Sequence, residues 1–116
     1  MPKKPKNPLR FIRARVNADD VRIQPNAVQE AYDDFEWGRA EIKKCLLKLN
    51  DRYYYLDRLK NHFYKHEPHA VFPQEDTHID FYRAHEILDK ESVFTHLYVR
   101  EKHTTVVVNS FKELYK

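Results

Sequence analysis

Apolar side chains recur every three or four residues through the first half of the chain, which is the spacing of one face of a helix. Three segments follow this pattern, residues 7–17, 26–35 and 40–50. Asn7 and Pro8 stand where an N-cap and a first helical residue are expected, and Asn26 with Gln29 predicts a capping box. The second helix is expected to bury one apolar stripe, formed by Val28, Ala31, Tyr32 and Phe35.

The segment 21–24 alternates apolar and polar side chains, which predicts a short strand between the first two helices. Gly38, the only glycine in the chain, stands before the third helix, where its conformational freedom would serve a turn. Its neighbour Trp37 is expected in the core or in a lid. Cys45 lies on the apolar stripe of the third helix, so we expect a small core residue rather than a nucleophile.

The second half of the chain changes to the period of strands. Residues 51–69 fit either state, because Leu56, Leu59 and Phe63 favour a helix whereas the tyrosines at 53–55 favour a strand. Prolines at 68 and 73 then predict a loop. A short strand is predicted at 79–83, and an antiparallel hairpin at 93–100 and 104–111. The order predicts an α+β fold, one domain over residues 1–116, with the helices packed on one face of an antiparallel sheet.

The turn of that hairpin decides which polar side chains share a face. His96, Tyr98 and Arg100 lie on one side of their strand, because side chains alternate. A two-residue turn would pair Val93 with Lys112 and put Tyr98 and Lys112 on opposite faces. A loop with an odd number of residues, or an equivalent bulge, would bring these two side chains onto the same face. The sequence leaves both registers open.

Positive charge is concentrated at the N-terminus, although the formal net charge is only +3 with histidine neutral. Residues 1–8 are predicted as a basic arm that could be flexible. Such a cluster suits a polyanion such as RNA or DNA, and the alternative is a charged end that only keeps the chain soluble. Six basic residues precede the first acidic one, Asp19: Lys3, Lys4, Lys6, Arg10, Arg13 and Arg15.

Several sequence features together predict a cytoplasmic protein that does not enter a membrane. No apolar run reaches the ~20 residues of a membrane span, and the basic N-terminus lacks the apolar region of a secretory signal. One cysteine cannot form an internal disulfide. His62, His66 and His69 have a spacing seen in metal ligands, but Pro68 interrupts it, so no metal and no cofactor are predicted.

Six segments resemble, in chain order, those of the MqsR family of type II toxin–antitoxin toxins, which are RelE-like ribonucleases. The resemblance covers most of the chain and implies the RelE-like, microbial-RNase-like form of the α+β fold. Its later segments match family motifs that carry the active site. The six segments are "VNADDVRI", "AEIKKCLLKLN", "HFYKH", "HIDFYR", "HLYVRE" and, at the end of the chain, "VVVNSFKE".

The resemblance implies that Lys65, Tyr98 and Lys112 are the catalytic residues. The glutamine of the family's "WQDVYR" motif falls on Ile79, so its role is either lost or taken by a neighbour such as His78. Cations suit the charge that develops on phosphorus during RNA cleavage, whereas a lysine can act as a base only if its pKa is lowered. Further phosphate or RNA contacts are expected from Arg83, Arg100, His66, His96, Arg13 and Arg15.

The sequence therefore predicts an endoribonuclease toxin that cleaves mRNA without a metal and is neutralised by a cognate antitoxin protein. A homodimer and a toxin–antitoxin hetero-oligomer are both open. One alternative is a weak or inactive module of the same fold that binds RNA or a partner. Another is an interaction protein whose basic arm is an electrostatic docking site.

Overall fold

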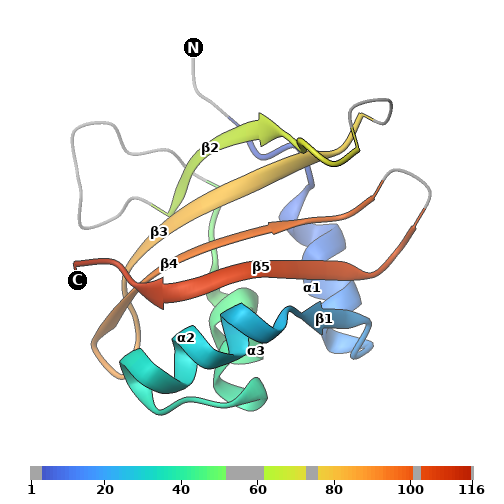
Figure 1. The fold of residues 1–116 in the computed structure, drawn as a ribbon. Coiled ribbons are helices and arrows are strands. Elements are labelled where there is room, and N and C mark those ends of the chain that lie inside the picture. The colour runs from blue at the N-terminus through green and yellow to red at the C-terminus, as the bar shows by residue number, and fades with distance from the viewer. Residues whose placement is uncertain (1–3, 52–61, 73–75, 101–102, 116) are drawn as a thin grey trace.

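Helices and strands follow one another in the part of the chain that the computed structural model describes, residues 4–51, 62–72, 76–100 and 103–115 (Figure 1). The helices in these residues are α1 (Leu9–Asn17), α2 (Pro25–Phe35) and α3 (Arg39–Lys48). The strands are β1 (Val21–Ile23), β2 (Phe63–Pro68), β3 (His78–Leu88), β4 (Glu91–Tyr98) and β5 (Val106–Glu113).

These strands form one sheet in the order β1-β5-β4-β3-β2. The predicted α+β class is confirmed, but the expectation of a wholly antiparallel sheet is wrong at one edge, because β1 runs parallel to β5 with Val21 opposite Val106. Bonds between distant residues fix this edge. The Val106 amide donates to the Asp20 carbonyl at 3.1 Å, and the Gln24 amide donates to the Val108 carbonyl at 3.0 Å. The alternation within 21–24 predicted a strand but could not indicate its partner.

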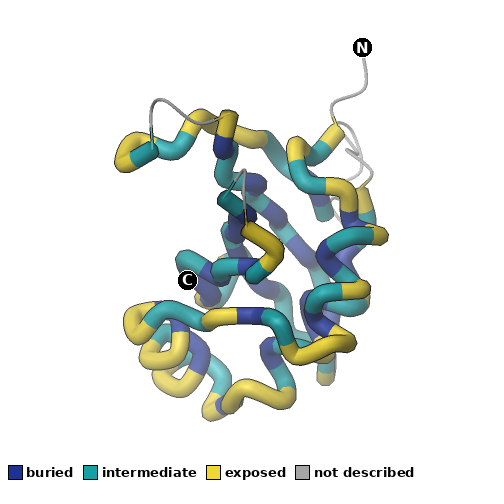
Figure 2. Tube along the Cα trace, turned by 90° about the vertical axis from the view of Figure 1, so that its right-hand side faces the viewer, coloured by how far each residue is buried: buried dark blue, intermediate teal, exposed yellow. Residues whose placement is uncertain are grey.

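One hydrophobic core lies between the helices and one face of the sheet. Buried positions alternate with half-buried ones along most of β3 and β4, as the two-residue period of a strand requires. Exposed positions gather on the outer turns of the helices and on the loops (Figure 2). The other face, which we call the open face, is not covered by any helix of the described residues. The helices contribute Leu9, Ile12, Val16, Ala27, Ala31, Ile42, Cys45 and Leu46 to the core.

Helix α2 lies along the edge of β5 beyond the end of β1 (Figure 1). Three of its side chains, each four residues after the last, bind the polar groups of that edge. Asn26 Nδ2 donates to the Asn109 carbonyl at 2.8 Å. Glu30 Oε1 accepts from the Phe111 amide at 3.1 Å and from the Ser110 hydroxyl at 2.8 Å. Asp34 Oδ2 accepts from the Glu113 amide at 2.8 Å. We call this row of side chains the α2 ladder.

The α2 ladder explains two errors of the sequence analysis. Asn26 is not part of a capping box, because α2 begins at Pro25 with Gln24 as its N-cap, and the Asn26 amide binds β5 instead. The predicted stripe is also rotated. Ala27 and Ala31 are buried, whereas Val28 and Tyr32 remain 47% and 61% exposed, because the helix turns the ladder toward β5.

The link between α2 and α3 turns at a different residue from the predicted one. Gly38 has φ −107°, which any residue can adopt, whereas Glu36 takes the left-handed conformation with φ 59°. The amide of Gly38 donates a hydrogen bond to the Glu41 carboxylate at 2.8 Å, which caps the start of α3. Trp37 is a core residue that stacks on Phe35 at 4.4 Å. Cys45 is also buried as predicted, and burial raises the pKa of its thiol to about 12.

In the second half of the chain, one predicted strand is longer than expected, and one uncertain segment lies mostly outside the described residues. The strand predicted at 79–83 extends over the longer range of β3. The tyrosines at 53–55, for which helix and strand were both open, lie outside the described residues. Phe63, which the helical alternative included, is buried at the start of β2.

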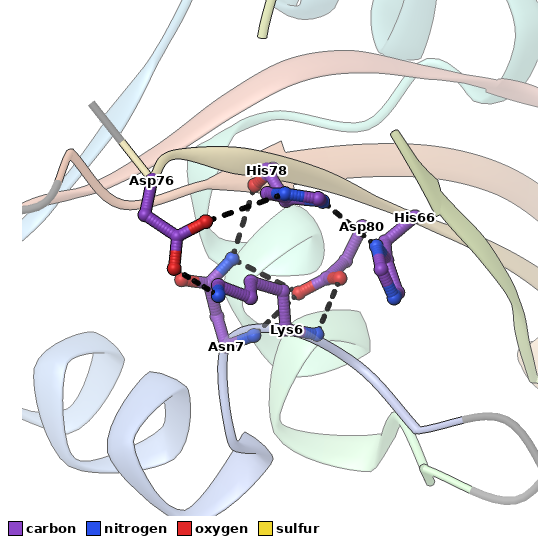
Figure 3. A network of polar contacts seen from close by, with 6 residues as sticks. All are labelled: Lys6, Asn7, His66, Asp76, His78 and Asp80. Carbon is purple, nitrogen blue, oxygen red and sulfur yellow. Dashed lines mark hydrogen bonds and ion pairs between the residues drawn. The ribbon is translucent and has the colours of Figure 1, made fainter. Parts of the chain in front are cut away.

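The end of the basic arm is docked on the helix side of β3 (Figure 3). The predicted helix cap at Asn7 is wrong, because α1 begins after Pro8 and the Asn7 side chain donates to the Asp80 carboxylate at 2.9 Å. Backbone amides of Lys6 and Asn7 donate to the same carboxylate at 2.8 and 2.9 Å. Asp80 is fully buried, and burial raises its pKa despite these bonds. The network comprises Lys6, Asn7, His66, Asp76, His78 and Asp80.

Replacing the central carboxylate of the α2 ladder tests its contribution to the fold. We expect Glu30→Ala to lower the free energy of unfolding by about 1–3 kcal/mol, because the Phe111 amide would lose its acceptor. Urea unfolding monitored by circular dichroism measures this change. The control is Asp33→Ala, which removes an exposed carboxylate of the same helix that accepts a bond from Gln29 and should shift stability by about 0.5 kcal/mol or less. Equal effects of the two variants would contradict the role of the ladder.

Candidate nucleic-acid interface

A bulge in β5 decides which residues of this strand reach the open face. Leu97 pairs with Val108 and Tyr98 with Val107, the register that a two-residue turn would give. One extra residue, Asn109, then shifts the pairing, so that Phe94 faces Lys112. A side chain lies on the same face as its cross-strand partner. The bulge therefore puts Lys112 on the open face together with Phe94 and Tyr98, which is the second of the two arrangements left open by the sequence.

Four rings from three strands lie on the open face, and we call them the aromatic platform; Phe81, Phe94 and His96 contact one another, and Tyr64 is linked to Phe81 through Lys65. Phe81 stacks on His96 with centroids 4.7 Å apart and planes inclined by 30°. Phe94 lies 6.3 Å from Phe81 and 6.0 Å from His96. Tyr64 extends the surface onto β2, where a second register shift occurs between Phe63 and Lys65. Each ring is half-buried, so part of its surface remains available for a stacking ligand. The members of the platform are Tyr64, Phe81, Phe94 and His96.

Three cations lie over the rings of the aromatic platform. Lys65 Nζ is 5.1 Å from the Phe81 centroid and 5.6 Å from that of Tyr64. The guanidinium of Arg83 lies 5.1 Å from the Tyr64 centroid. Lys112 Nζ lies 5.7 Å from the Phe94 centroid. Cation–π contacts of this length contribute about 0.5–1 kcal/mol each at exposed sites, so they orient the cations without neutralising their charge.

His96 occupies the middle of the platform and differs from an exposed histidine. Burial lowers its pKa, and the nearby Lys112 cation acts in the same direction. The imidazole is therefore neutral near pH 7. Asn109 Nδ2 lies 3.3 Å from Nδ1 of the ring. An amide nitrogen can only donate, so Nδ1 accepts and the proton of the neutral ring resides on Nε2.

The surroundings of Lys65 favour its protonated, cationic form over the neutral form that could act as a base. Its Nζ donates to the Glu67 carboxylate at 2.8 Å, and this bond raises the pKa of Lys65. The lowered pKa that base catalysis by lysine requires is thus absent at Lys65. Both side chains are partly exposed, 38% for Lys65 and 53% for Glu67. An exposed pair of this kind contributes at most about 1 kcal/mol, so an incoming phosphate can compete for the ammonium group.

Tyr98 lies on the open face but outside the platform. It is four residues along β4 from Phe94, a separation of about 13 Å at the rise of a strand. Its ring contacts those of His69 at 4.5 Å and Phe72 at 6.4 Å. The Arg100 guanidinium lies 3.9 Å over the Phe72 ring at the same end. Lys65 and Lys112 therefore both lie over rings of the platform, whereas Tyr98 lies farther along the same face, beside His69.

The other predicted contacts lie away from the open face. His66 and His78 approach each other at 2.8 Å in the docked network of the N-terminal segment. Within β3, Ile79 lies on the open face, and its neighbour His78 lies on the other side of the strand. Arg13 donates to the Leu49 carbonyl at 2.7 Å and links α1 to the end of α3. Arg15 pairs with Asp20 at 3.6 Å.

The residues that sequence reasoning missed are the aromatic members of the open face. Phe81 and Phe94 stand at positions that alternate with buried residues, so the two-residue period alone could have placed both on the polar face. Tyr64 and Asn109 carry no such signal, because a bulge breaks the period at each of them. Among the described residues, no group of three or more His, Cys, Asp and Glu side chains is arranged to hold a metal ion.

The neutral state of His96 makes a prediction about stability. A histidine whose pKa is lowered by folding takes up its proton first in the unfolded chain, so stability is full above its ordinary pKa of 6.5 and falls below it. His96→Asn should therefore reduce the fall in unfolding free energy between about pH 7.5 and about pH 5. Urea unfolding at both pH values measures the difference. The buried His62 supplies a second contribution of the same sign, and an unchanged fall in the His96 variant would contradict the prediction.

No known relative indicates the function of this site, so its own chemistry has to suggest one. No helix of the described residues is long and apolar enough to cross a membrane. A fold alone would not establish a function in any case. Searches against protein-family models, curated proteins and solved structures gave no match for this chain.

Proposed function

We propose that the open face binds single-stranded RNA and cleaves it without a metal ion. The observation that carries this proposal is the arrangement of three cations around one aromatic platform with a neutral histidine at its centre. Bases of a single strand stack on aromatic side chains, while lysine and arginine contact the phosphates. A paired duplex keeps its base faces stacked internally, so this surface suits a single strand better.

The cleavage step that fits these residues is attack of the 2′-hydroxyl on the adjacent phosphorus. The bond from O2′ to phosphorus forms, the bond from phosphorus to O5′ breaks, and the products are a 2′,3′-cyclic phosphate and a 5′-hydroxyl. Lys65, Arg83 and Lys112 stabilise the negative charge on the phosphoryl oxygens, which is usually the largest catalytic effect. The proton of the 2′-hydroxyl passes to water.

His96 is the proton donor in this scheme. Its neutral form donates a hydrogen bond from Nε2 to a phosphoryl oxygen, and its protonated form transfers the Nε2 proton to the departing 5′-oxygen. Phosphate bound beside the ring favours the charged form and raises the pKa. The rate should therefore increase as pH falls below about 6.5, until the fold loses stability. Tyr98 is only 7% exposed and packs against His69 and Phe72, so it supports the next part of the same face instead of acting in the cleavage step.

A second candidate is a module that binds RNA without cleaving it. Two observations favour it, the ion pair of Lys65 with Glu67 and the apolar Ile79 at the position of the family's glutamine. The resemblance to MqsR toxins favours cleavage and extends the proposal to a RelE-like fold and a cognate antitoxin. If the protein is such a toxin, its expression should arrest cell growth, and co-expression of a neighbouring open reading frame that encodes the antitoxin should relieve the arrest.

RNA cleavage by the purified protein in EDTA tests the enzyme directly. We expect fragments that end in a cyclic phosphate, and we expect Lys65→Ala and Lys112→Ala each to slow cleavage by about 10²-fold or more, the loss typical of a donor to the transition state. Gel electrophoresis and mass spectrometry of the fragments measure both outcomes. Lys44→Ala removes an exposed lysine of α3 and should cleave normally. RNA that stays intact at all pH values would refute the enzyme and favour the module that binds RNA without cleaving it.

Stacking on the platform is tested separately from cleavage. Phe94→Ala should weaken binding of a short single-stranded RNA by about 1–3 kcal/mol, since one base loses its stacking surface. Lys112→Ala should instead reduce the slope of log affinity against log salt concentration by about 0.7, the value for one phosphate contact. Fluorescence anisotropy at several salt concentrations distinguishes the two effects. Unchanged affinity in Phe94→Ala would show that RNA does not use the platform.

A further inference from the structure

A pocket of about 470 Å³ lies on the open face beyond the platform, at the junction of β1, β5 and β4. Its lining includes Arg22, Phe72, Tyr98, Arg100, His103 and Val107. Among the described residues, the lining has two arginines and no carboxylate. Ligand pockets for small molecules have volumes of about 300–1,000 Å³, so this one is large enough for an organic anion rather than a single ion.

The pairing of the strands places the walls of this pocket. Arg22 of β1 and Tyr98 of β4 both pair with Val107 of β5. These three side chains therefore stand in one row across the sheet, with neighbouring strands about 4.8 Å apart. Val107 forms an apolar floor, and a guanidinium and a phenol rise on either side of it. The pocket thus depends on β1 lying beside β5.

The segment after β2 supplies an aromatic wall. Phe72 lies under the Arg100 guanidinium at 3.9 Å, and the ring of His69 packs against Tyr98 at 4.5 Å. Stacking uses the flat face of a guanidinium, whereas its hydrogen bonds point outward in the plane. A stacked arginine can therefore contact a phosphate or the edge of a base. Stacked aromatic and guanidinium planes are the surfaces on which unpaired bases pack.

We propose that this pocket binds a nucleoside monophosphate unit. Its phosphate contacts Arg22, and its base packs against the wall of Phe72, Arg100 and Tyr98. The unit can be a free nucleotide or one residue of an RNA strand that continues from the platform. Binding of the free nucleotide goes beyond the proposed function, because it needs neither the platform nor cleavage.

Titration of the protein with 5′-AMP, 5′-GMP, 5′-CMP and 5′-UMP tests this proposal, with inorganic phosphate as the comparison. We expect at least one nucleotide to bind, and to bind more tightly than phosphate, with amide shifts in two-dimensional NMR at Arg22, Tyr98 and Val107. Arg22→Ala should weaken that binding by about tenfold or more, since charge-assisted bonds to a phosphate are lost. Lys44→Ala, which removes an exposed lysine of α3 that does not line the pocket, should leave nucleotide binding unchanged.

The outcomes separate this proposal from the proposed function. Absence of nucleotide binding, phosphate binding as tightly as any nucleotide, or full binding in Arg22→Ala would overturn the pocket, even if RNA is cleaved. Nucleotide binding without RNA cleavage would support the pocket and refute the nuclease. In a supporting result, RNA affinity that also falls in Arg22→Ala identifies the unit as part of a strand, and unchanged RNA affinity identifies the free nucleotide. Arg22→Lys, which keeps the charge at this exposed position, provides a variant with less risk to folding.

Discussion

The α2 ladder fixes the edge of β5, and the register of β5 determines the chemistry of the open face. The helix binds the carbonyl of the bulged residue Asn109 through Asn26 and the amides beyond it through Glu30 and Asp34. An edge strand without such partners would present unpaired polar groups and could slip in register. With the bulge held in place, Lys112 faces Phe94 on the open side. Without the bulge, the same lysine would point into the core.

The open face combines groups whose environments set their charge in opposite directions. Partial burial among aromatic rings lowers the pKa of His96, whereas the exposed bond to Glu67 raises that of Lys65. The two residues contact the same ring, Phe81, from different strands. A cation and a neutral, titratable donor thus lie within one stacking surface, which is the arrangement on which the proposed cleavage of a phosphodiester depends.

The two faces of β3 have different tasks because its side chains alternate. On the helix side, Asp80 binds the backbone of Lys6 and Asn7 and attaches the N-terminal segment to the sheet. On the open side, Phe81 and Arg83 join the platform. This division also separates the basic residues of the chain. In α1, Arg13 binds the Leu49 carbonyl and Arg15 pairs with Asp20, while Arg83 and Lys112 of the strands lie over the rings of the platform.

The sequence alone determined the fold class, the three helices of the described residues, the terminal hairpin and the core position of Cys45. It succeeded there because helix and strand periods are local properties of the chain. Only the tertiary structure decided the partner of β1, the rotation of α2, the docking of Asn7 and the face of Lys112. Each of these depends on bonds between residues distant in sequence, and a bulge of one residue reverses the side on which every later side chain lies. The resemblance to a toxin family pointed to Lys65, Tyr98 and Lys112, but the arrangement of rings and cations around His96 became visible only once four strands lay side by side.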